Sequence, residues 1–365
     1  MGLLRLHLRS TRKFDPIIPR HLQKRMPGFF LLRSLLNRLF KSNAQIEYCR
    51  SWLINLHDSW AMSHLQPGDS LAAGVGWSVS PARYCRQHGG TVVLEARTTH
   101  PHNFWTVNTS ENIRWGFNRA AWDLRFYLQK LQALKHANYV FCPSEPVRDS
   151  YINFGWPKEN CLCLSYPVSL DNFRPLRDKP LTSGKVKLCT TGSLDLRKGA
   201  PYLFQAVERC LKRKLPIEFH CVNTFHENFL PIYQKLFSSI PVIFHKPMSQ
   251  AELAVFLRSM DLFCLPSLEE GRARTVLEAL ASGLPAIITA ETGSADLIRD
   301  GENGTVITAR SARQLELAIS TWAARLCARP YDRSKSCLLA APIGEESFQK
   351  AFATELQRVL TIPRQ

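Results

Sequence analysis

Short apolar runs and stretches with helical periodicity alternate along most of the chain, and this alternation is typical of parallel α/β proteins. In the first half, three apolar runs predict buried strands: TVVLEAR at 91–97, NYVFCPS at 138–144 and CLCLSYP at 161–167. Residues 111–136 continue a helical pattern of aromatic and basic side chains, which predicts one long helix. Ser144 stands where it could cap the helix that follows the second of these strands.

A second series of elements begins after residues 171–185, whose prolines, charges and glycine are typical of a linker. Six apolar runs predict its strands: KVKLCTTG, IEFHCVN, PVIFHK, DLFCLPS, LPAIITA and GTVIT. Ser249 and Glu252 have the spacing of a capping box, which predicts that a helix begins there. Further helices are expected over 311–328 and 345–360. A chain of 365 residues with two such series is expected to form two domains.

The positive charge is concentrated at the start of the chain. Of a net charge of +17, residues 1–50 carry +9, because they hold 11 Lys and Arg but only two acids. Residues 1–60 show no clear strand, but in FFLLRSLLNRLF (29–40) leucines recur at helical spacing with arginines between them, as in an amphipathic helix. Such a segment suits an anionic lipid surface. A solvated face that keeps the protein soluble is an equally good interpretation.

The 11 cysteines are scattered and include no C-x-x-C pair, so the spacing typical of metal ligands is absent. Cys161 and Cys163 are the closest pair, and their place in a predicted strand indicates core filling. Unpaired thiols fit a reducing cytoplasm. Neither a signal peptide nor a run of about 18 apolar residues is visible. We therefore expect a cytoplasmic protein that can associate peripherally with the membrane.

Two glutamates flank a glycine turn between a predicted strand, DLFCLPS, and a predicted helix, VLEALASG, with Gly283 at its end. Glu270 and Gly271 fall in the turn, and in an open parallel sheet ligands bind beyond the carboxyl ends of the strands. The helix N-terminus there offers backbone N–H groups to an anion. Glu278 lies about two turns along the helix. The two carboxylates could therefore hold the two sugar-like ends of a nucleotide sugar.

A second candidate motif is TTGSLDLRKGAPYLFQA, residues 190–206. A predicted strand ends at Gly192, and Arg197 and Lys198 come just before a predicted helix. A diphosphate needs cations, and Arg and Lys at a turn between a strand and a helix supply them. The chain contains no Asp-x-Asp, the usual carboxylate pair that holds a divalent ion on a diphosphate. Side-chain cations and helix dipoles are therefore expected to replace a metal ion.

Together, these motifs resemble those of the retaining glycosyltransferases of family 4, which have the GT-B fold. The shared string is E-x₇-E, from Glu270 to Glu278, inside LPS–EG–VLEA–ASGLP–DGENG, and the resemblance covers about residues 185–308. It implies two Rossmann-like, doubly wound domains that face a cleft. The implied bounds are 1–175 for an acceptor-binding domain, 183–340 for a nucleotide-sugar-binding domain, and 345–362 for a C-terminal helix that crosses back to the first domain.

The resemblance also implies roles for single residues. Glu270 would contact the transferred sugar, Glu278 the ribose, and Lys198 the diphosphate. His100, just after a predicted strand, matches a histidine near the anomeric centre, although a lone histidine is often structural. Backbone N–H groups at 271–274 would meet sugar and phosphate. The other residues implied at the donor are Gly192, Arg197, Met248, Gly271, Val276 and Leu277.

This sequence departs from the family at several places, two of which bear most on its activity. The usual Gly-Arg-Leu reads Gly192–Ser193–Leu194, so one diphosphate arginine is absent and Arg197 is expected to compensate. Residues 1–60 show neither the strand nor the glycine-rich loop with which the family opens.

We expect a metal-independent hexosyltransferase that needs no cofactor. It would move a sugar, with retention, from a nucleoside-diphosphate sugar to an acceptor hydroxyl in lipid-linked or cell-surface polysaccharide or lipopolysaccharide synthesis. The alternative is a GT-B protein that binds a nucleotide sugar without turnover. A sugar-nucleotide epimerase shares the fold, but E-x₇-E with the Arg-Lys-Gly turn favours a transferase. Nucleic-acid binding is suggested by charge alone, without aromatic platforms or a recognition helix, and is not expected.

Overall fold

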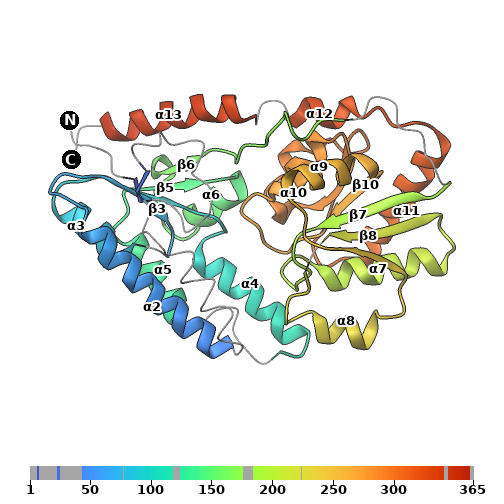
Figure 1. Ribbon diagram of the computed structural model, residues 1–365, viewed down its shortest axis with the longest axis horizontal. Helices are drawn as coiled ribbons and strands as arrows, with labels where there is room; N and C mark the ends of the chain where they lie inside the picture. The colour runs from blue at the N-terminus through green and yellow to red at the C-terminus, as the bar shows by residue number, and fades with distance from the viewer. Residues whose placement is uncertain are drawn as a thin grey trace. The chain divides into compact units, whose positions relative to one another are not determined.

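The chain divides into two compact units of alternating strands and helices (Figure 1). The computed structural model describes residues 6–7, 23–24, 43–76, 78–117, 124–175, 184–222, 224–340 and 344–361. Unit 1 comprises Met1–Thr106, Ala120–Leu164 and Gln349–Gln365, and unit 2 comprises Val107–Arg119 and Ser165–Phe348. Each unit is described below by itself.

Unit 1 is built on a four-stranded parallel sheet with the strand order β3–β4–β5–β6. The strands are β3 (Leu71–Gly74), β4 (Val92–Glu95), β5 (Tyr139–Cys142) and β6 (Cys161–Cys163). Two strands of two residues, β1 (Leu6–His7) and β2 (Gln23–Lys24), pair with each other in parallel. The helices are α2 (Asn43–Met62), α3 (Val79–Gln87), α5 (Leu124–Leu134), α6 (Glu145–Ile152) and the 3₁₀ helix η2 (Lys158–Asn160), together with the start of α4 (Pro101–Arg114), whose residues from Val107 on belong to unit 2.

The sheet of unit 1 has an apolar core on each face, as expected when alternate side chains of a buried strand point to opposite sides. On one face, side chains such as Leu94, Val140 and Cys161 pack with α3, α5 and α6. On the other face, Phe141 and Leu162 pack with α13 (Glu345–Thr361), whose contacts are Phe352, Leu356 and Val359. Helix α13 therefore completes the core of unit 1, as expected for a C-terminal helix that crosses back to the first domain.

Unit 2 contains a six-stranded parallel sheet with the order β12–β11–β10–β7–β8–β9. The strands are β7 (Val186–Thr191), β8 (Ile217–Val222), β9 (Val242–His245), β10 (Leu262–Leu265), β11 (Ala286–Thr289) and β12 (Gly304–Ile307). When β7 to β12 are numbered 1 to 6 and the sheet is read from β9, this is the Rossmann order 3-2-1-4-5-6. The order reverses between β7 and β10, and such a switch point is where ligands bind in doubly wound sheets.

Helices cover both faces of this sheet and leave a buried apolar layer on each side. Side chains of α7 (Ala200–Lys212), α8 (Leu230–Leu236) and α11 (Ala312–Ala328) join one core cluster. Side chains of α9 (Gln250–Ser259) and α10 (Arg274–Ala281) join the other. The short helices η3 (Ala290–Thr292), η4 (Ala295–Leu297) and α12 (Ser334–Ala340) complete the unit. The central strands β10 and β11 are buried at every position, because both of their faces are covered.

The nine apolar runs predicted as strands all contain one, and the capping box of Ser249 and Glu252 is present at the start of α9. The single helix predicted over 111–136 is wrong, because α4 ends at Arg114 and a turn follows in which Gly116 has a φ of +84°. Ser144 does precede α6, but its side chain makes no capping hydrogen bond. The helix predicted over 29–40 lies outside the described residues.

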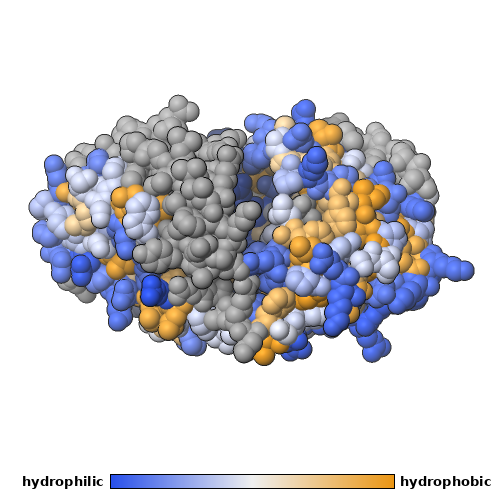
Figure 2. All heavy atoms as spheres, turned by 60° about the horizontal axis from the view of Figure 1, so that its bottom comes forward, coloured by the Kyte–Doolittle hydropathy of each residue, from blue (hydrophilic) through white to orange (hydrophobic). Residues whose placement is uncertain are grey.

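Within the described part of the chain, no helix has both the length and the hydropathy needed to cross a bilayer. Figure 2 shows one face of the molecule, where hydrophobic groups form separate patches among hydrophilic ones. Exposed apolar side chains include Leu230 and Leu236 on α8 and Ile243 and Phe244 on the edge strand β9.

Candidate functional site

The turns after β7 and β10 lie at the switch point of unit 2 and carry the predicted site residues. β7 and β10 are hydrogen-bonded neighbours, with Leu188 opposite Leu262 and Cys189 opposite Phe263. Because parallel neighbours end at the same edge of a sheet, the turns that follow them meet there. A backbone hydrogen bond of 2.7 Å from the N–H of Leu268 to the carbonyl of Arg197 joins the two turns.

The turns also touch at Gly199, which directly precedes α7 and has a φ of +70°. A Cβ atom at this position would lie 2.0 Å from the carbonyl oxygen of Pro266, which is far inside van der Waals contact. Only glycine allows both this backbone conformation and this approach. The turn after β7 is therefore held directly against the turn after β10.

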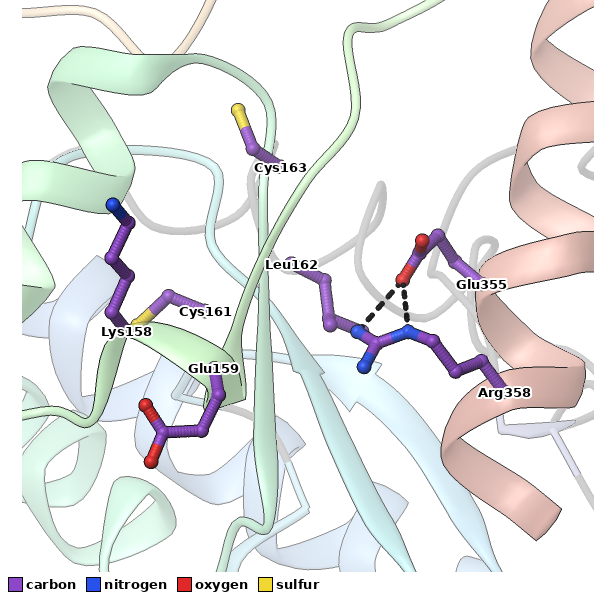
Figure 3. A pocket seen from close by; sticks show the side chains of 7 residues that line it. All are labelled: Lys158, Glu159, Cys161, Leu162, Cys163, Glu355 and Arg358. Atoms are coloured by element: carbon purple, nitrogen blue, oxygen red, sulfur yellow. Dashed lines mark hydrogen bonds and ion pairs between the residues drawn. The ribbon is translucent and has the colours of Figure 1, made fainter. Parts of the chain in front are cut away.

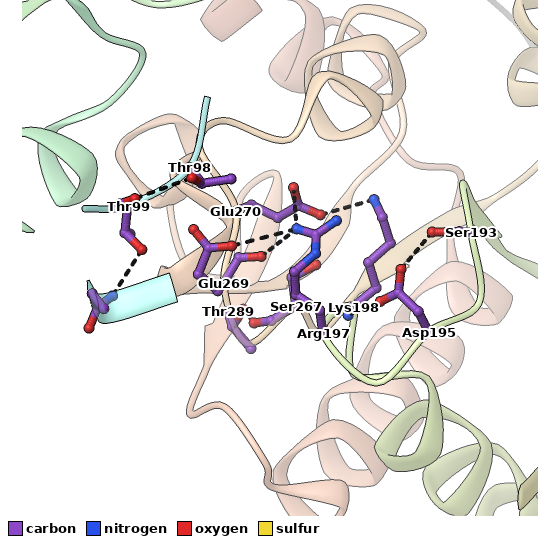
Figure 4. Close-up of polar contacts among 11 residues, drawn as sticks. Thr98, Thr99, Ser193, Asp195, Arg197, Lys198, Ser267, Glu269, Glu270 and Thr289 are labelled. Carbon is purple, nitrogen blue, oxygen red and sulfur yellow. Dashed lines mark hydrogen bonds and ion pairs between the residues drawn. The ribbon is translucent and has the colours of Figure 1, made fainter. Parts of the chain in front are cut away.

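Arg197, Lys198 and Glu270 form one ion cluster across the two turns (Figure 4). The distance from Arg197 Nη1 to Glu270 Oε2 is 2.9 Å, and Lys198 Nζ lies 2.9 Å from Glu270 Oε1. Arg197 Nη1 also donates to the backbone carbonyl of Glu269 at 2.7 Å. The three side chains are 23%, 15% and 13% exposed, respectively, so the cluster is largely shielded but accessible.

The cluster fixes the charge of its carboxylate. Burial alone would raise the pKa of Glu270, but the positive charges of Arg197 and Lys198 lower it to about 2. Burial would likewise lower the pKa of Arg197, and the neighbouring carboxylates, Glu270 first, raise it instead. Near neutral pH, Glu270 is therefore an anion that neutralises much of the positive charge of its two partners.

Asp195 shapes the turn that presents the two cations. Its Oδ1 accepts the backbone N–H of Lys198 at 2.7 Å, and its Oδ2 accepts the hydroxyl of Ser193 at 2.6 Å (Figure 4). The predicted Gly192 ends the preceding strand, and its N–H donates to the carbonyl of Val222 at 3.0 Å. Sequence analysis missed Asp195, although an Asp placed to hydrogen-bond the backbone a few residues on is a recognisable turn signal.

Glu278 is a nearly buried carboxylate on α10. Its residue is 7% exposed, and among the described residues it has no hydrogen bond or ion pair through its side chain. Burial raises the pKa of Glu278 to about 7, and the positive charge of Arg274, four residues earlier on the helix, opposes this only in part. A polar group in this state is costly to keep unless something binds to it.

The segment after β11 packs against the turn that precedes α10. The N–H of Glu270 donates to the carbonyl of Glu291 at 2.9 Å, and the N–H of Ala273 donates to that of Thr292 at 3.0 Å. The guanidinium of Arg272 makes a bidentate pair with Asp296, with contacts of 2.9 and 2.7 Å. The N–H of Ala273 is therefore already bonded within the protein, and the part predicted for the other N–H groups of 271–274 stays a prediction. Sequence analysis did not identify the Arg272–Asp296 pair.

The other residues predicted at the donor fall into two groups. Val276 and Leu277 are fully buried in the core beneath α10, and their N–H groups lie 2.9 and 3.4 Å from the carbonyl of Ala273. Their side chains therefore serve packing. Met248 is partly buried and packs against the same core just before α9, while Gly271 lies in the turn beside Glu270.

His100 belongs to unit 1, where it directly precedes α4. Its ring stacks on Phe154 at 4.4 Å between centroids and meets Tyr151 edge-on at 5.1 Å. The backbone N–H of His102 points to its Nδ1 at 3.3 Å. Burial, and then the charge of His102, lower the pKa of His100 to about 4, so the imidazole is neutral at pH 7. Its predicted part in catalysis stays a prediction.

The described residues contain no group of three or more His, Cys, Asp or Glu side chains that could hold a metal ion. At the switch point the structure brings together two cations, Arg197 and Lys198, and three carboxylates (Asp195, Glu269 and Glu270). The turns after β7 and β10 hold them there. Such a cluster can exchange one anionic partner for another, because its cations are already placed and only their partner needs to change.

Comparison with known proteins matches residues 173–325 to the family described as glycosyl transferases group 1. Among curated proteins, D-inositol 3-phosphate glycosyltransferase of Mycobacterium tuberculosis (strain ATCC 25618 / H37Rv) is 36% identical over 98 residues. That match covers 27% of this chain and 20% of the relative. The similarity to such curated relatives thus spans about a fifth of their length.

Solved structures extend the likeness over most of the chain. Sucrose-phosphate synthase from Thermosynechococcus elongatus has a TM-score of 0.65 at 15% identity, over 89% of this chain and 81% of that one. Anabaena Alr3699/HepE in complex with UDP has a TM-score of 0.65 at 16% identity, over 84% and 82%. At such low identity these neighbours show the fold, which is GT-B with two Rossmann-like domains. Residues 173–325 thus match the glycosyl transferases group 1 model, in a chain with the GT-B fold.

Proposed function

We propose that this protein is a retaining glycosyltransferase of the hexosyltransferase type. It would transfer a sugar from a nucleoside-diphosphate sugar to an acceptor hydroxyl. The observation that carries the proposal is the ion cluster of Arg197, Lys198 and Glu270 at the switch point of unit 2. Doubly wound sheets bind nucleotides at this position, and paired Arg and Lys side chains suit a diphosphate. The group 1 domain supports the same reading.

The cluster suggests how the chain's own residues would act. A bound donor would bring its diphosphate to Arg197 and Lys198, which would then leave Glu270 for the phosphate oxygens. Glu270, with its low pKa, would remain an anion and accept hydrogen bonds from hydroxyls of the transferred sugar. As the glycosidic bond breaks, negative charge grows on the diphosphate, and the two cations would stabilise it without a prior rearrangement of solvent.

Glu278 supports the proposal from the other end of the donor. A nearly buried carboxylate without a side-chain partner among the described residues is well suited to accept the two hydroxyls of a ribose. When a ribose binds, this carboxylate would gain the hydrogen bonds that it lacks in the structure. Together, Glu270 and Glu278 would then hold a sugar and a ribose, respectively, with the diphosphate between them on the cations.

The test is a panel of nucleoside-diphosphate sugars, with released nucleoside diphosphate as the readout and acceptor saccharides added in turn. We expect one donor class to be turned over, and the anomeric configuration of the product to match that of the donor. If a donor binds in calorimetry but no nucleoside diphosphate is released with any acceptor, the alternative of a binding protein without turnover is correct. Inversion at the anomeric carbon would contradict the proposed stereochemistry.

Removal of divalent ions is expected to leave donor turnover unchanged. The chain has no Asp-x-Asp motif, and the proposed site places side-chain cations where a metal ion would otherwise be needed. The measurement is release of nucleoside diphosphate with and without EDTA. Loss of activity in EDTA that magnesium or manganese restores would contradict the prediction.

The acceptors in this proposal are lipid-linked or cell-surface saccharides, since residues 1–50 carry a charge of +9. We predict that this segment binds anionic vesicles at the cytoplasmic face of the membrane, and that salt weakens the binding, because exposed charges are screened over about 10 Å at 0.1 M. Flotation with neutral and anionic vesicles measures it. Replacing Arg33 and Arg38 together with glutamine should weaken binding.

The matched control replaces two exposed arginines, Arg209 on α7 and Arg213 directly after it, with glutamine. This variant has the same net charge as the first and should bind vesicles like the wild type. Equal binding to neutral and anionic vesicles, or equal losses in the two variants, would show that the basic N-terminal segment is not a membrane contact.

A further inference from the structure

A surface pocket of about 460 Å³ lies on unit 1 beside β6 and α13 (Figure 3). Lys158 and Glu159 at its wall are exposed, and Glu355 and Arg358 on α13 pair with each other at 2.9 Å. The charged side chains of this wall are therefore held by solvent or by one another. The pocket specifies no ligand, in contrast to the buried polar groups of unit 2.

Glu111 is a wholly buried carboxylate on the part of α4 that belongs to unit 2. Its Oε1 accepts hydrogen bonds from the indole N–H of Trp115 at 2.9 Å and from the hydroxyl of Tyr202 at 2.6 Å. Its Oε2 accepts a hydrogen bond from Nε of Arg310 at 2.7 Å. A buried charge is costly unless it is paired and hydrogen-bonded, and both oxygens of this one are. The carboxylate therefore joins α4 to the start of α7 and to the turn before α11.

Arg310 holds a backbone conformation that is unusual for a residue other than glycine. It lies between β12 and α11 and has a φ of +63°. Such a conformation costs free energy and persists where the surrounding contacts hold it. The bond from Arg310 to Glu111 is a contact of this kind. Because β12 is parallel to the other strands of its sheet, this turn lies at the same edge as the turns after β7 and β10.

Tyr202 connects Glu111 with the two turns of the ion cluster. It lies in the first turn of α7, and its N–H donates to the carbonyl of Gly199 at 3.1 Å. Its ring belongs to the same small apolar cluster as Leu268, whose N–H bonds to the carbonyl of Arg197. Burial first, and then the hydrogen bond and charge of Glu111, raise the pKa of Tyr202 to about 12. The hydroxyl therefore keeps its proton near neutral pH and remains a donor to Glu111.

We propose that Glu111 and Tyr202 are positioning residues of the donor site, an inference that rests on the proposed function. In the structure, Glu270 pairs with Arg197 and Lys198, and this restraint ends when the two cations turn to the diphosphate. The bond from Tyr202 to Glu111 lies outside the ion cluster and keeps its partners during this exchange. It therefore holds the start of α7, and with it both turns, while the cations are engaged. Cations that are already in place stabilise a developing charge without reorganisation.

Tyr202→Phe removes the hydroxyl alone and tests this role through donor kinetics. We expect kcat to fall roughly two- to tenfold, the loss that corresponds to one hydrogen bond. KM for the donor should change less than about twofold, because the restraint matters most after Glu270 has released the cations. Glu111→Gln keeps the shape but leaves one carbonyl oxygen for three donors, so it should lower kcat at least as much. Since both changes affect one bond, the double variant should lose less than the product of the two single losses.

The matched control is Tyr331→Phe, which removes another partly buried hydroxyl of unit 2. This hydroxyl lies 2.8 Å from that of Ser336 and takes no part in the ion cluster, so the variant should keep the kcat of the wild type. Circular dichroism checks that each variant folds, and Tyr202→Phe carries the test if Glu111→Gln does not fold. A wild-type kcat in Tyr202→Phe, or an equal loss in Tyr331→Phe, would overturn the positioning role and leave the proposed function standing.

Hydrogen exchange of the full chain separates this inference from the proposed function. The N–H groups of Lys198 and Leu268 bond to Asp195 and to the carbonyl of Arg197, respectively, and so report on the two turns. Tyr202→Phe should speed their exchange, whereas the control variant should not. If the wild type releases no nucleoside diphosphate from any donor, the proposed function fails, and these two amides alone decide whether the bond to Glu111 holds the turns. Unchanged exchange at both amides would show that it does not.

Discussion

Lys198→Ala is expected to lower turnover of the sugar donor by about ten- to a hundredfold and to weaken donor binding less. The ammonium of Lys198 lies 2.9 Å from Glu270 and, in the proposed site, moves to a diphosphate whose negative charge grows as the glycosidic bond breaks. An interaction that strengthens in the transition state affects kcat more than binding. A charge-assisted contact contributes roughly 1.5–3 kcal/mol, which corresponds to that range of rates.

Glu270→Gln should lower turnover of the donor without weakening binding of the nucleotide. The substitution removes the negative charge that occupies Arg197 and Lys198 in the structure, so the bare nucleoside diphosphate should bind as tightly as to the wild type or more tightly. Turnover of the full donor should fall, because a neutral amide is a weaker partner for sugar hydroxyls. Since the pKa of Glu270 is about 2, this difference should persist from pH 5 to pH 9.

Calorimetry with nucleoside diphosphate and kinetics with donor, on the same two variants, measure both effects. Lys212→Ala is the matched control, because Lys212 is an exposed lysine of α7 that pairs with Glu208 and takes no part in the site. It should behave like the wild type in both assays. If Glu270→Gln turns over donor normally, or Lys198→Ala changes neither quantity, the donor does not bind at this switch point.

Glu278→Gln is expected to make the protein more stable than the wild type above about pH 7. Folded Glu278 holds its proton up to about pH 7, whereas the unfolded chain releases it near the ordinary value of 4.5. Between these values the folded state binds more protons, so the stability of the wild type falls as the pH rises. A shift of this size corresponds to roughly 3 kcal/mol once the pH is above both values.

Thermal unfolding from pH 5 to pH 8.5 tests this expectation. The stability difference between Glu278→Gln and the wild type should grow across the range, while Glu208→Gln, which alters a partly exposed carboxylate on α7, should run parallel to the wild type. Binding of a ribose-containing nucleotide should strengthen with pH in the wild type and lose this dependence in Glu278→Gln. Parallel unfolding curves for Glu278→Gln and the wild type would show that the buried carboxylate is ionised throughout.

Strands and helices of unit 2 could be predicted from the sequence because their apolar runs are long, rich in branched residues and closed by turns. β3 was missed for the opposite reason, since Leu-Ala-Ala-Gly is short and carries little β-branched surface. α2 was missed because its apolar and polar residues form only a weak stripe along the helix. The break between α4 and α5 could not be seen because aromatic and basic residues continue across it.

The site was predicted as two motifs, and the structure adds their contact. Glu270 and Lys198 are 72 positions apart in the sequence, and only the strand order, with β7 beside β10, makes them neighbours. Local sequence patterns do not indicate that Glu270 neutralises Arg197 and Lys198. Nor do they indicate that the carbonyls of Glu291 and Thr292 accept hydrogen bonds from the turn before α10. Burial of Val276 and Leu277 follows from helix packing that spacing alone does not specify.

The close approach of Gly199 to Pro266 has a consequence for how this site moves. Since the two backbones touch without a side chain between them, the turns that carry the cations and the carboxylate cannot slide past each other or open separately. Hydrogen exchange of the N–H of Leu268, which bonds to Arg197, should therefore report on both turns at once. A ligand that orders one turn would protect the amides of the other, even where it touches none of them.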